Sequence, residues 1–166
     1  MNQFSMLVGR RGVVAALTAI ALLPALTQRG LAQSDPLTGT WKLNLAKSAY
    51  SPGPAPKSAS LTYRAQGQNV LRIAEGVDAE GKPTKSEWAH VYDGKPYPTP
   101  GVADYDTSSY TRVDSRTVSF SRIKGGKAVQ AGLIVVSGDG RTMTITTAGT
   151  NPNGQQVNNV AVCDKQ

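Results

Sequence analysis

Two arginines, Arg112 and Arg122, are the charged residues whose positions best suit them to bind a ligand. A three-residue turn at 114–116 would join their segments as a hairpin, with Tyr110 opposite Phe120 and both arginines on the same apolar face. A guanidinium offers a planar set of donors that suits a carboxylate, so either arginine could anchor the polar group of a bound molecule. Alternatively, each arginine lies near a strand end and reaches out to solvent at the rim.

A second cluster comprises Trp88, His90 and Tyr92, which alternate along one segment and so share one face of a predicted strand. His90 is the member that titrates near neutral pH, so the cluster could line a polar pocket. Two other interpretations stay open. The cluster could be an aromatic stripe of the core, or it could face outward with Ala89 and Val91 inside.

Catalysis and metal binding find little support in the composition. The chain of 166 residues contains one His and one Cys, the residue types on which zinc and iron–sulfur sites mainly draw. It contains no Gly-x-Ser-x-Gly motif, and His90 has no Ser or Asp partner at a recognisable spacing. The sequence therefore predicts no catalytic residue, no metal and no cofactor. An enzyme is the less favoured hypothesis, because it requires at least two of His90, Arg112 and Arg122 to converge on one cavity.

The segments that carry these residues are short, rich in β-forming side chains and separated by turns of Gly, Asn and Asp. Nine such runs occur, at 39–44, 59–65, 69–77, 84–92, 107–113, 117–123, 127–136, 141–150 and 155–163. A tenth at 95–97 would lie at an edge, because Pro96 and Pro98 cannot donate to a ladder. A long meander of hairpins curls to protect its edges. The predicted fold class is all-β, a lipocalin-like up-and-down antiparallel β-barrel of about nine or ten strands.

The lumen of this barrel is predicted from the two hairpins whose register can be argued. In the earlier hairpin, a three-residue turn at 66–68 places Leu61 and Tyr63 on the face of Leu71 and Ile73. A two-residue turn would instead set Leu71 and Ile73 against Arg64 and Thr62, and the prediction rejects it because it separates the apolar residues. The predicted ligand-binding residues are Tyr63, Leu71, Ile73, Trp88, His90, Tyr110, Arg112, Phe120 and Arg122.

Residues 1–32 have the layout of a secretory signal peptide, which leaves 33–166 as the folded domain. Arg10 and Arg11 precede an apolar run of 14 residues, shorter than the ~20 needed to span a bilayer, and small residues stand before a cleavage site after Ala32. A buried or anchoring N-terminal helix is the alternative. We expect a periplasmic or secreted protein that does not span the membrane. Without this segment the formal charge falls from +7 to +4 with no basic cluster, so nucleic acid is not an expected partner.

The first predicted strand contains Gly39-Thr40-Trp41-Lys42-Leu43, and here the chain resembles the calycins, which are the lipocalins and fatty-acid-binding proteins. The resemblance implies that Trp41 packs across one end of the barrel and that the lumen binds a small apolar or amphipathic molecule. Fatty-acid-binding proteins hold the ligand carboxylate with an Arg-x-Tyr on the closing strand, where this chain has Ala161 and Cys163. That carboxylate site is therefore not expected at these positions.

The chain also resembles a set of exported bacterial proteins that open Gly-Thr-Trp-Lys-Leu-Asn and continue into a Ser-Pro-Gly-Pro loop. This resemblance implies no activity. The corresponding loop 51–58 is either a strap across one barrel end or a lid over a ligand. Together with the tyrosine-bearing loop 93–106, it could instead bind a protein partner, if the lumen is packed too tightly for a ligand. Cys163 lies in a predicted strand, which favours a buried thiol over an intermolecular disulfide.

Overall fold

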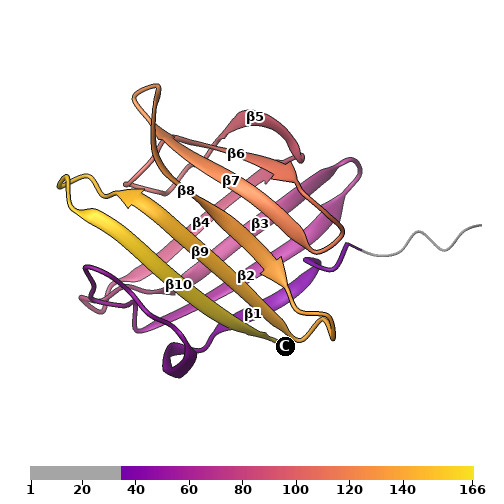
Figure 1. Cartoon of the computed structure of the whole chain (residues 1–166), viewed down its shortest axis with the longest axis horizontal. Helices are drawn as coiled ribbons and strands as arrows, with labels where there is room; N and C mark the ends of the chain where they lie inside the picture. The colour runs from indigo at the N-terminus through magenta and orange to yellow at the C-terminus, as the bar shows by residue number, and fades with distance from the viewer. Residues whose placement is uncertain (1–34) are drawn as a thin grey trace, which may run out of the picture. The chain divides into compact units, whose positions relative to one another are not determined.

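The structure is a computed structural model that describes residues 35–166, and the predicted signal peptide 1–32 lies outside the described residues. The described chain consists of β-strands and one short 3₁₀ helix, η1 (Leu45–Lys47) (Figure 1). The strands are β1 (Gly39–Leu43), β2 (Ser58–Gln66), β3 (Asn69–Val77), β4 (Pro83–His90), β5 (Asp93–Pro98), β6 (Thr107–Arg112), β7 (Thr117–Lys124), β8 (Lys127–Val136), β9 (Thr142–Thr150) and β10 (Gln156–Lys165). In the described part of the chain, no helix is long and apolar enough to span a membrane.

All ten strands belong to one antiparallel sheet whose order is β4-β3-β2-β1-β10-β9-β8-β7-β6-β5. Neighbours in sequence pair throughout, except that the first strand pairs with the last and that β4 and β5 stand at the two ends of the order. The sheet thus curls into a nearly closed up-and-down barrel, which confirms the predicted fold class. The tenth strand, β5, is an end strand as its prolines require.

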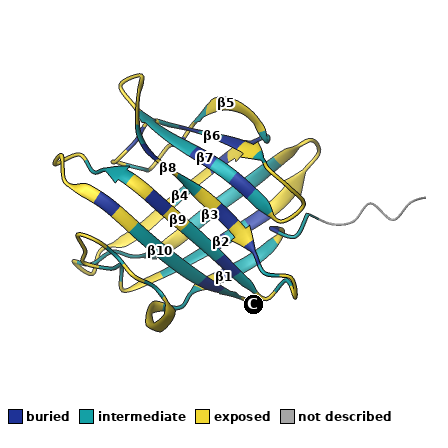
Figure 2. Cartoon of the chain, in the orientation of Figure 1, coloured by how far each residue is buried: buried dark blue, intermediate teal, exposed yellow. Residues whose placement is uncertain are grey.

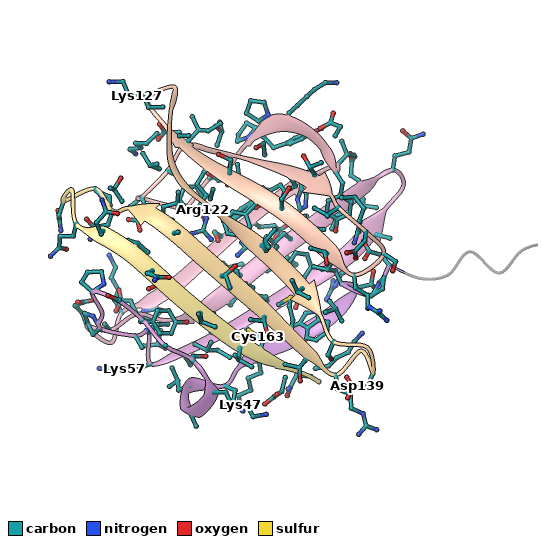
Figure 3. All side chains as sticks on the ribbon, in the orientation of Figure 1. Lys47, Lys57, Arg122, Lys127, Asp139 and Cys163 are labelled. Carbon is teal, nitrogen blue, oxygen red and sulfur yellow. The ribbon has the colours of Figure 1, made fainter. Side chains whose placement is uncertain are left out.

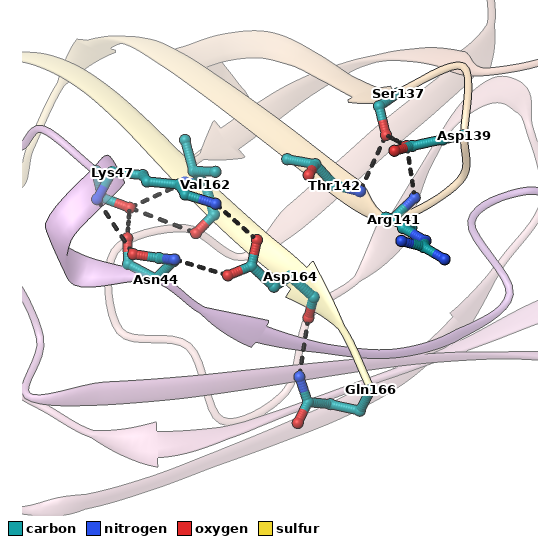
Figure 4. Close-up of polar contacts among 10 residues, drawn as sticks. Asn44, Lys47, Ser137, Asp139, Arg141, Thr142, Val162, Asp164 and Gln166 are labelled. Atoms are coloured by element: carbon teal, nitrogen blue, oxygen red, sulfur yellow. Dashed lines mark hydrogen bonds and ion pairs between the residues drawn. The ribbon is translucent and has the colours of Figure 1, made fainter.

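The first and last strands, β1 and β10, pair within the sheet, with Trp41 opposite Lys165 and Leu43 opposite Cys163. Asp164 reinforces this seam, since its carboxylate accepts hydrogen bonds from Asn44 at 2.6 Å and from Lys47 at 3.4 Å (Figure 4). The Lys47–Asp164 ion pair is exposed and contributes little to stability by itself, whereas the Asn44–Asp164 hydrogen bond is partly buried. The main stabilisation of the barrel comes from burial of the apolar side chains on its inner face.

Alternate residues of each strand point inward, and Figure 2 shows buried and exposed positions following one another along the strands. Figure 3 shows the side chains as sticks on the ribbon, with Arg122 on β7 and Cys163 on β10 labelled. The core includes Trp41, which is fully buried, and the neighbouring Leu37, whose carbonyl accepts a hydrogen bond from the Trp41 indole at 2.8 Å. Cys163 on β10 is buried, as the sequence predicts.

The register of β6 and β7 agrees with the sequence prediction. Tyr110 pairs with Phe120 and Arg112 with Val118, across the expected three-residue turn. Tyr110, Val118 and Phe120 are buried, so this face lies inside the barrel and carries both Arg112 and Arg122.

The predicted register of β2 and β3 is wrong. Gln66 pairs with Asn69, so the turn has two residues, and Gly67 adopts the positive φ of 62° that such a tight turn needs. Leu71 then pairs with Arg64 and Ile73 with Thr62 on the outer wall of the barrel, where both apolar residues are half-buried. Leu71 and Ile73 therefore do not line the lumen. The prediction placed the apolar residues of this strand inside the barrel, but the inner face of β3 carries the charged residue Arg72.

The ends of the barrel differ in what covers them. One end, here called the N-terminal mouth, is formed by the segment 35–37 that leads into β1 and by the turns 67–68, 91–92, 114–116 and 137–141. The opposite end carries the loop 44–57, whose bridge between Ala49 and Val160 ties it to β10. The proline-rich part of this loop is exposed for the most part and runs along that end.

Candidate ligand-binding site

Arg72 is the residue that the corrected register brings into the lumen. It is the cross-strand partner of Tyr63 on β2 and of Trp88 on β4, both of which are buried. Its guanidinium carbon lies 4.3 Å from the centre of the Trp88 ring, and its Nη1 atom is buried without a protein partner. Arg72 is not among the ligand-binding residues predicted from the sequence. The signal that could have found it is Gly67, which favours the shorter turn.

His90 lies beside this arginine, deep in the barrel. It is 1% exposed and stacks on Tyr110 with the ring centres 4.0 Å apart. Burial lowers the pKa of His90 to about 4, the charge of Arg72 adds to the shift, and the charge of Asp35 partly opposes it. The imidazole is therefore neutral at pH 7 and offers one donor and one acceptor. Neither ring nitrogen has a protein partner.

Tyrosine hydroxyls supply further donors inside the barrel. Burial raises the pKa of Tyr63 and of Tyr110, and the positive charges of Arg72 and Arg122 only partly oppose this effect. Burial also raises the pKa of Tyr92, and the nearby Asp35 carboxylate raises it further. All three phenols therefore stay protonated and able to donate.

Several buried polar atoms of the described residues have no hydrogen-bond partner in the protein. They are Tyr63 Oη, Arg72 Nη1, Trp88 Nε1, His90 Nδ1 and Nε2, Tyr92 Oη, Ser108 Oγ and Arg112 Nη1. Three of these, on Arg72, Trp88 and Arg112, can only donate. Leaving a buried donor unpaired costs ~1–3 kcal/mol, so such a set indicates that water or a ligand completes the bonds.

Arg112 lies at the N-terminal mouth, where its Nη2 forms an ion pair with Asp35. Its guanidinium carbon is 4.0 Å from the centre of the Tyr92 ring. A hollow of about 650 Å³ opens beside this group, lined by Asp35, Val70, Tyr92, Arg112 and the turns 67–69, 114–116 and 137–140. A volume of this size falls within the range that suits a small ligand.

Arg122 lies toward the opposite end and has a different environment. Its Nη1 donates to Gln130 at 2.7 Å, and its guanidinium carbon is 4.8 Å from the ring centres of both Tyr105 and Phe120. A smaller hollow of about 200 Å³ adjoins it, bounded partly by Tyr50 and the proline loop. Arg112 and Arg122 therefore share the inner face but line different hollows.

The predicted residues thus fall into three groups. Five lie buried inside the barrel, namely Tyr63, Trp88, His90, Tyr110 and Phe120. Arg112 and Arg122 are half-buried on the same inner face near its two ends. Leu71 and Ile73 are outside. Within residues 35–166, no group of three or more His, Cys, Asp or Glu side chains could hold a metal ion.

The segment 93–106 is predicted to be a recognition loop that exposes its tyrosines, but the structure does not expose both of them. Tyr105 is only 7% exposed, and its ring packs beside Arg122 inside the barrel. Tyr97 is half-buried and pairs with the buried Ser108 on β6. Its ring centre lies 6.5 Å from that of His90, and its hydroxyl donates to the Asp93 carboxylate at 3.1 Å.

Comparison with solved structures finds similarity to several proteins at low sequence identity. The zebrafish ileal bile acid-binding protein complexed with cholic acid is 11% identical, with 79% of this chain and 99% of that chain covered and a TM-score of 0.49. As-p18, an extracellular fatty acid binding protein, is 12% identical, with 80% and 97% covered and a TM-score of 0.49. Lobster apocrustacyanin A1 is 13% identical, with 81% and 62% covered and a TM-score of 0.41.

No protein-family model and no curated protein sequence matches the chain. The resemblance to exported proteins that share the Gly-Thr-Trp-Lys-Leu-Asn opening therefore stays a prediction.

Proposed function

We propose that the barrel binds a small amphipathic molecule in its lumen, with an acidic group held near Arg72. The observation that carries the proposal is the set of buried donors around Arg72 that have no partner in the protein. An acidic ligand supplies acceptors and a negative charge at once.

The charges of the inner face favour an anion over a neutral polar group. Three arginines, Arg72, Arg112 and Arg122, point inward, and among residues 35–166 the ion pairs include one with Arg112 and none with the other two. A buried cation is costly unless it is paired and hydrogen-bonded. The Trp88 ring offsets part of this cost for Arg72, and a ligand carboxylate or sulfonate would offset more.

The rest of the lumen suits an apolar body. Val118 and Met143 are fully buried on the inner face, and Val70, Ala74 and Ile145 pack against the same core. Each Å² of apolar ligand surface removed from water against such walls contributes ~25 cal/mol. The expected ligand therefore combines an apolar or aromatic body with one acidic group.

Two fluorescent probes test this. Anilinonaphthalenesulfonate (ANS) and N-phenylnaphthylamine share one aromatic skeleton, and only ANS carries a sulfonate. We expect ANS to bind the protein more tightly, and Arg72→Gln to weaken ANS binding roughly tenfold or more while leaving N-phenylnaphthylamine nearly unchanged, because one charge-assisted hydrogen bond is lost.

The matched control is Arg64→Gln, which removes the same charge from an exposed position on the outer wall, eight residues earlier in the chain. It should leave both probes unaffected. Failure of both probes to bind the folded wild-type protein would reject lumen binding. Equal weakening of ANS by the two variants would show that general charge attraction, and not Arg72, holds the sulfonate.

Export to the periplasm or exterior is proposed on the signal-peptide pattern of residues 1–32. Protein purified from the envelope of its own host should have the intact mass of a chain whose first residue is Gln33. Native mass spectrometry of the same sample should show an additional mass that is lost on denaturation, and this mass identifies the natural ligand. A mass that retains residues 1–32 contradicts export with cleavage.

A further inference from the structure

We propose that Arg112 and Tyr92 form a second anion subsite of the lumen, which the chain fills with its own Asp35 carboxylate. Asp35 would then compete with an anionic ligand for the N-terminal mouth. This inference rests on the proposed function, and it concerns the same barrel at a different set of side chains.

Asp35 reaches Arg112 from outside the sheet. It lies in the segment that precedes β1, and Leu37, two residues further on, is 1% exposed and fixed by the indole hydrogen bond from Trp41. One Asp35 oxygen accepts from the backbone N–H of Leu37 at 3.0 Å, and the other meets Arg112 Nη2. The carboxylate is thus placed by a local turn and not by a strand.

The subsite formed by Arg112 and Tyr92 has more hydrogen-bond donors than Asp35 uses. Arg112 Nη1 is buried and unpaired although Nη2 is taken, so the guanidinium makes one of the two parallel bonds that a carboxylate can accept from it. Tyr92 Oη is also buried without a protein partner, and the Tyr92 ring lies beneath the guanidinium. A ligand carboxylate, sulfonate or phosphate that replaced Asp35 in this subsite could accept hydrogen bonds from Arg112 Nη1, Arg112 Nη2 and Tyr92 Oη.

The Asp35–Arg112 pair can also be reached from the mouth. The side chains of Arg112 and Asp35 are 27% and 25% exposed, so the pair is only partly shielded from solvent and from an incoming anion. The hollow of about 650 Å³ adjoins both residues, so an incoming acidic group has room to approach. Competition between the two anions follows from this geometry.

The test compares Asp35→Asn with wild-type protein in ANS and N-phenylnaphthylamine titrations. Asparagine keeps the oxygen that accepts from Leu37 but loses the charge that pairs with Arg112. We expect ANS to bind Asp35→Asn about threefold to tenfold more tightly, with N-phenylnaphthylamine unchanged. The double variant with Arg112→Gln should lose this gain.

Asp139→Asn is the matched control, because Asp139 lines the same hollow without touching Arg112. Its carboxylate accepts from Ser137 and from the Arg141 N–H within the β8–β9 turn, and asparagine retains an acceptor there (Figure 4). A gain in ANS affinity as large as that of Asp35→Asn would show a long-range charge effect and overturn the inference.

Tyr92→Phe provides a second variant that leaves the ion pair intact and keeps the ring under Arg112. It should weaken ANS by about threefold and leave N-phenylnaphthylamine unchanged. If ANS binds wild type, Asp35→Asn and Tyr92→Phe equally well, the subsite is rejected and lumen binding through Arg72 stands. If ANS binds none of them, both proposals fall.

Discussion

The guanidinium of Arg72 lies over the Trp88 ring, 4.3 Å from its centre, across the β3–β4 ladder and inside the barrel. A cation over an indole gains ~0.5–2 kcal/mol, which is less than the cost of burying an unpaired charge. The barrel therefore holds Arg72 at the expense of stability. Arg72 therefore lowers the stability of the fold but supplies the positive charge of the proposed binding site.

Replacing Arg72 by methionine should stabilise the protein while abolishing the preference for ANS over N-phenylnaphthylamine. Methionine has a similar volume and no charge to desolvate, so the free energy of unfolding should rise by about 1 kcal/mol. Urea unfolding measures this change. Arg64→Met on the outer wall is the control and should leave the midpoint nearly unchanged. A loss of stability larger than in the control would instead make Arg72 a structural residue of the core.

The same arginine shows why sequence reasoning succeeded for one hairpin and failed for another. Strand alternation fixes the two faces of a strand but not which face is inside. Between β6 and β7, the inward aromatic residues Tyr110 and Phe120 settled that choice correctly. On β3 the rule of placing apolar residues inside chose Leu71 and Ile73, whereas the lumen takes Arg72.

The ends of the barrel were predictable only in part. Trp41 could be placed at one end from the first-strand motif, and its burial agrees. The Asp35–Arg112 pair joins residues 77 apart in sequence through a segment with no regular structure. No periodicity or spacing indicates such a contact, because it depends on how the loop before β1 turns back into the mouth.

Gly132 on β8 should not tolerate a side chain. A Cβ atom there would lie 2.7 Å from Phe120 Cζ and would collide with the carbonyl oxygen of Thr146 on β9. Gly132→Ala should therefore destabilise the barrel by about 2 kcal/mol or more, as measured by urea unfolding. Gly138→Ala is the control, because the nearest atom to its Cβ is Arg116 Nη1 at 3.9 Å. Equal effects of the two variants would contradict close packing of Phe120 against β8.

The Cys163 thiol should be unreactive in the folded protein. It is 2% exposed, and burial, with a smaller effect of the Asp164 charge, raises its pKa to about 11. At pH 8 few molecules carry the reactive thiolate, and those that do are shielded. A chromogenic disulfide reagent should label the native protein very slowly and the urea-unfolded protein at once. Rapid labelling of native protein, or a disulfide-linked dimer on a non-reducing gel, would contradict the buried position.

His90 should make the protein less stable as the pH falls. Its pKa is about 4 in the folded state and ~6.5 when unfolded, so between these values the unfolded chain binds the proton and the folded chain does not. The contribution of neutral His90 to the free energy of unfolding is therefore complete above pH 6.5 and declines as the pH falls toward 4, by ~3 kcal/mol. The groups that face His90 are Arg72, Asp35 and the rings of Tyr92, Tyr97 and Tyr110.

The His90→Phe variant isolates this effect from the titration of carboxylates. Phenylalanine preserves the ring stacked on Tyr110 and has no proton to bind, while every Asp and Glu stays in place. Urea unfolding at pH 7 and at pH 4.5 should show a smaller loss of stability in the variant than in wild type. Because Arg72 contributes to the lowered pKa, Arg72→Met should also reduce the loss, though by less than His90→Phe. Parallel loss in wild type and His90→Phe would mean that the imidazole already binds a proton in the folded barrel, and that the lumen is wetter than the burial of His90 implies.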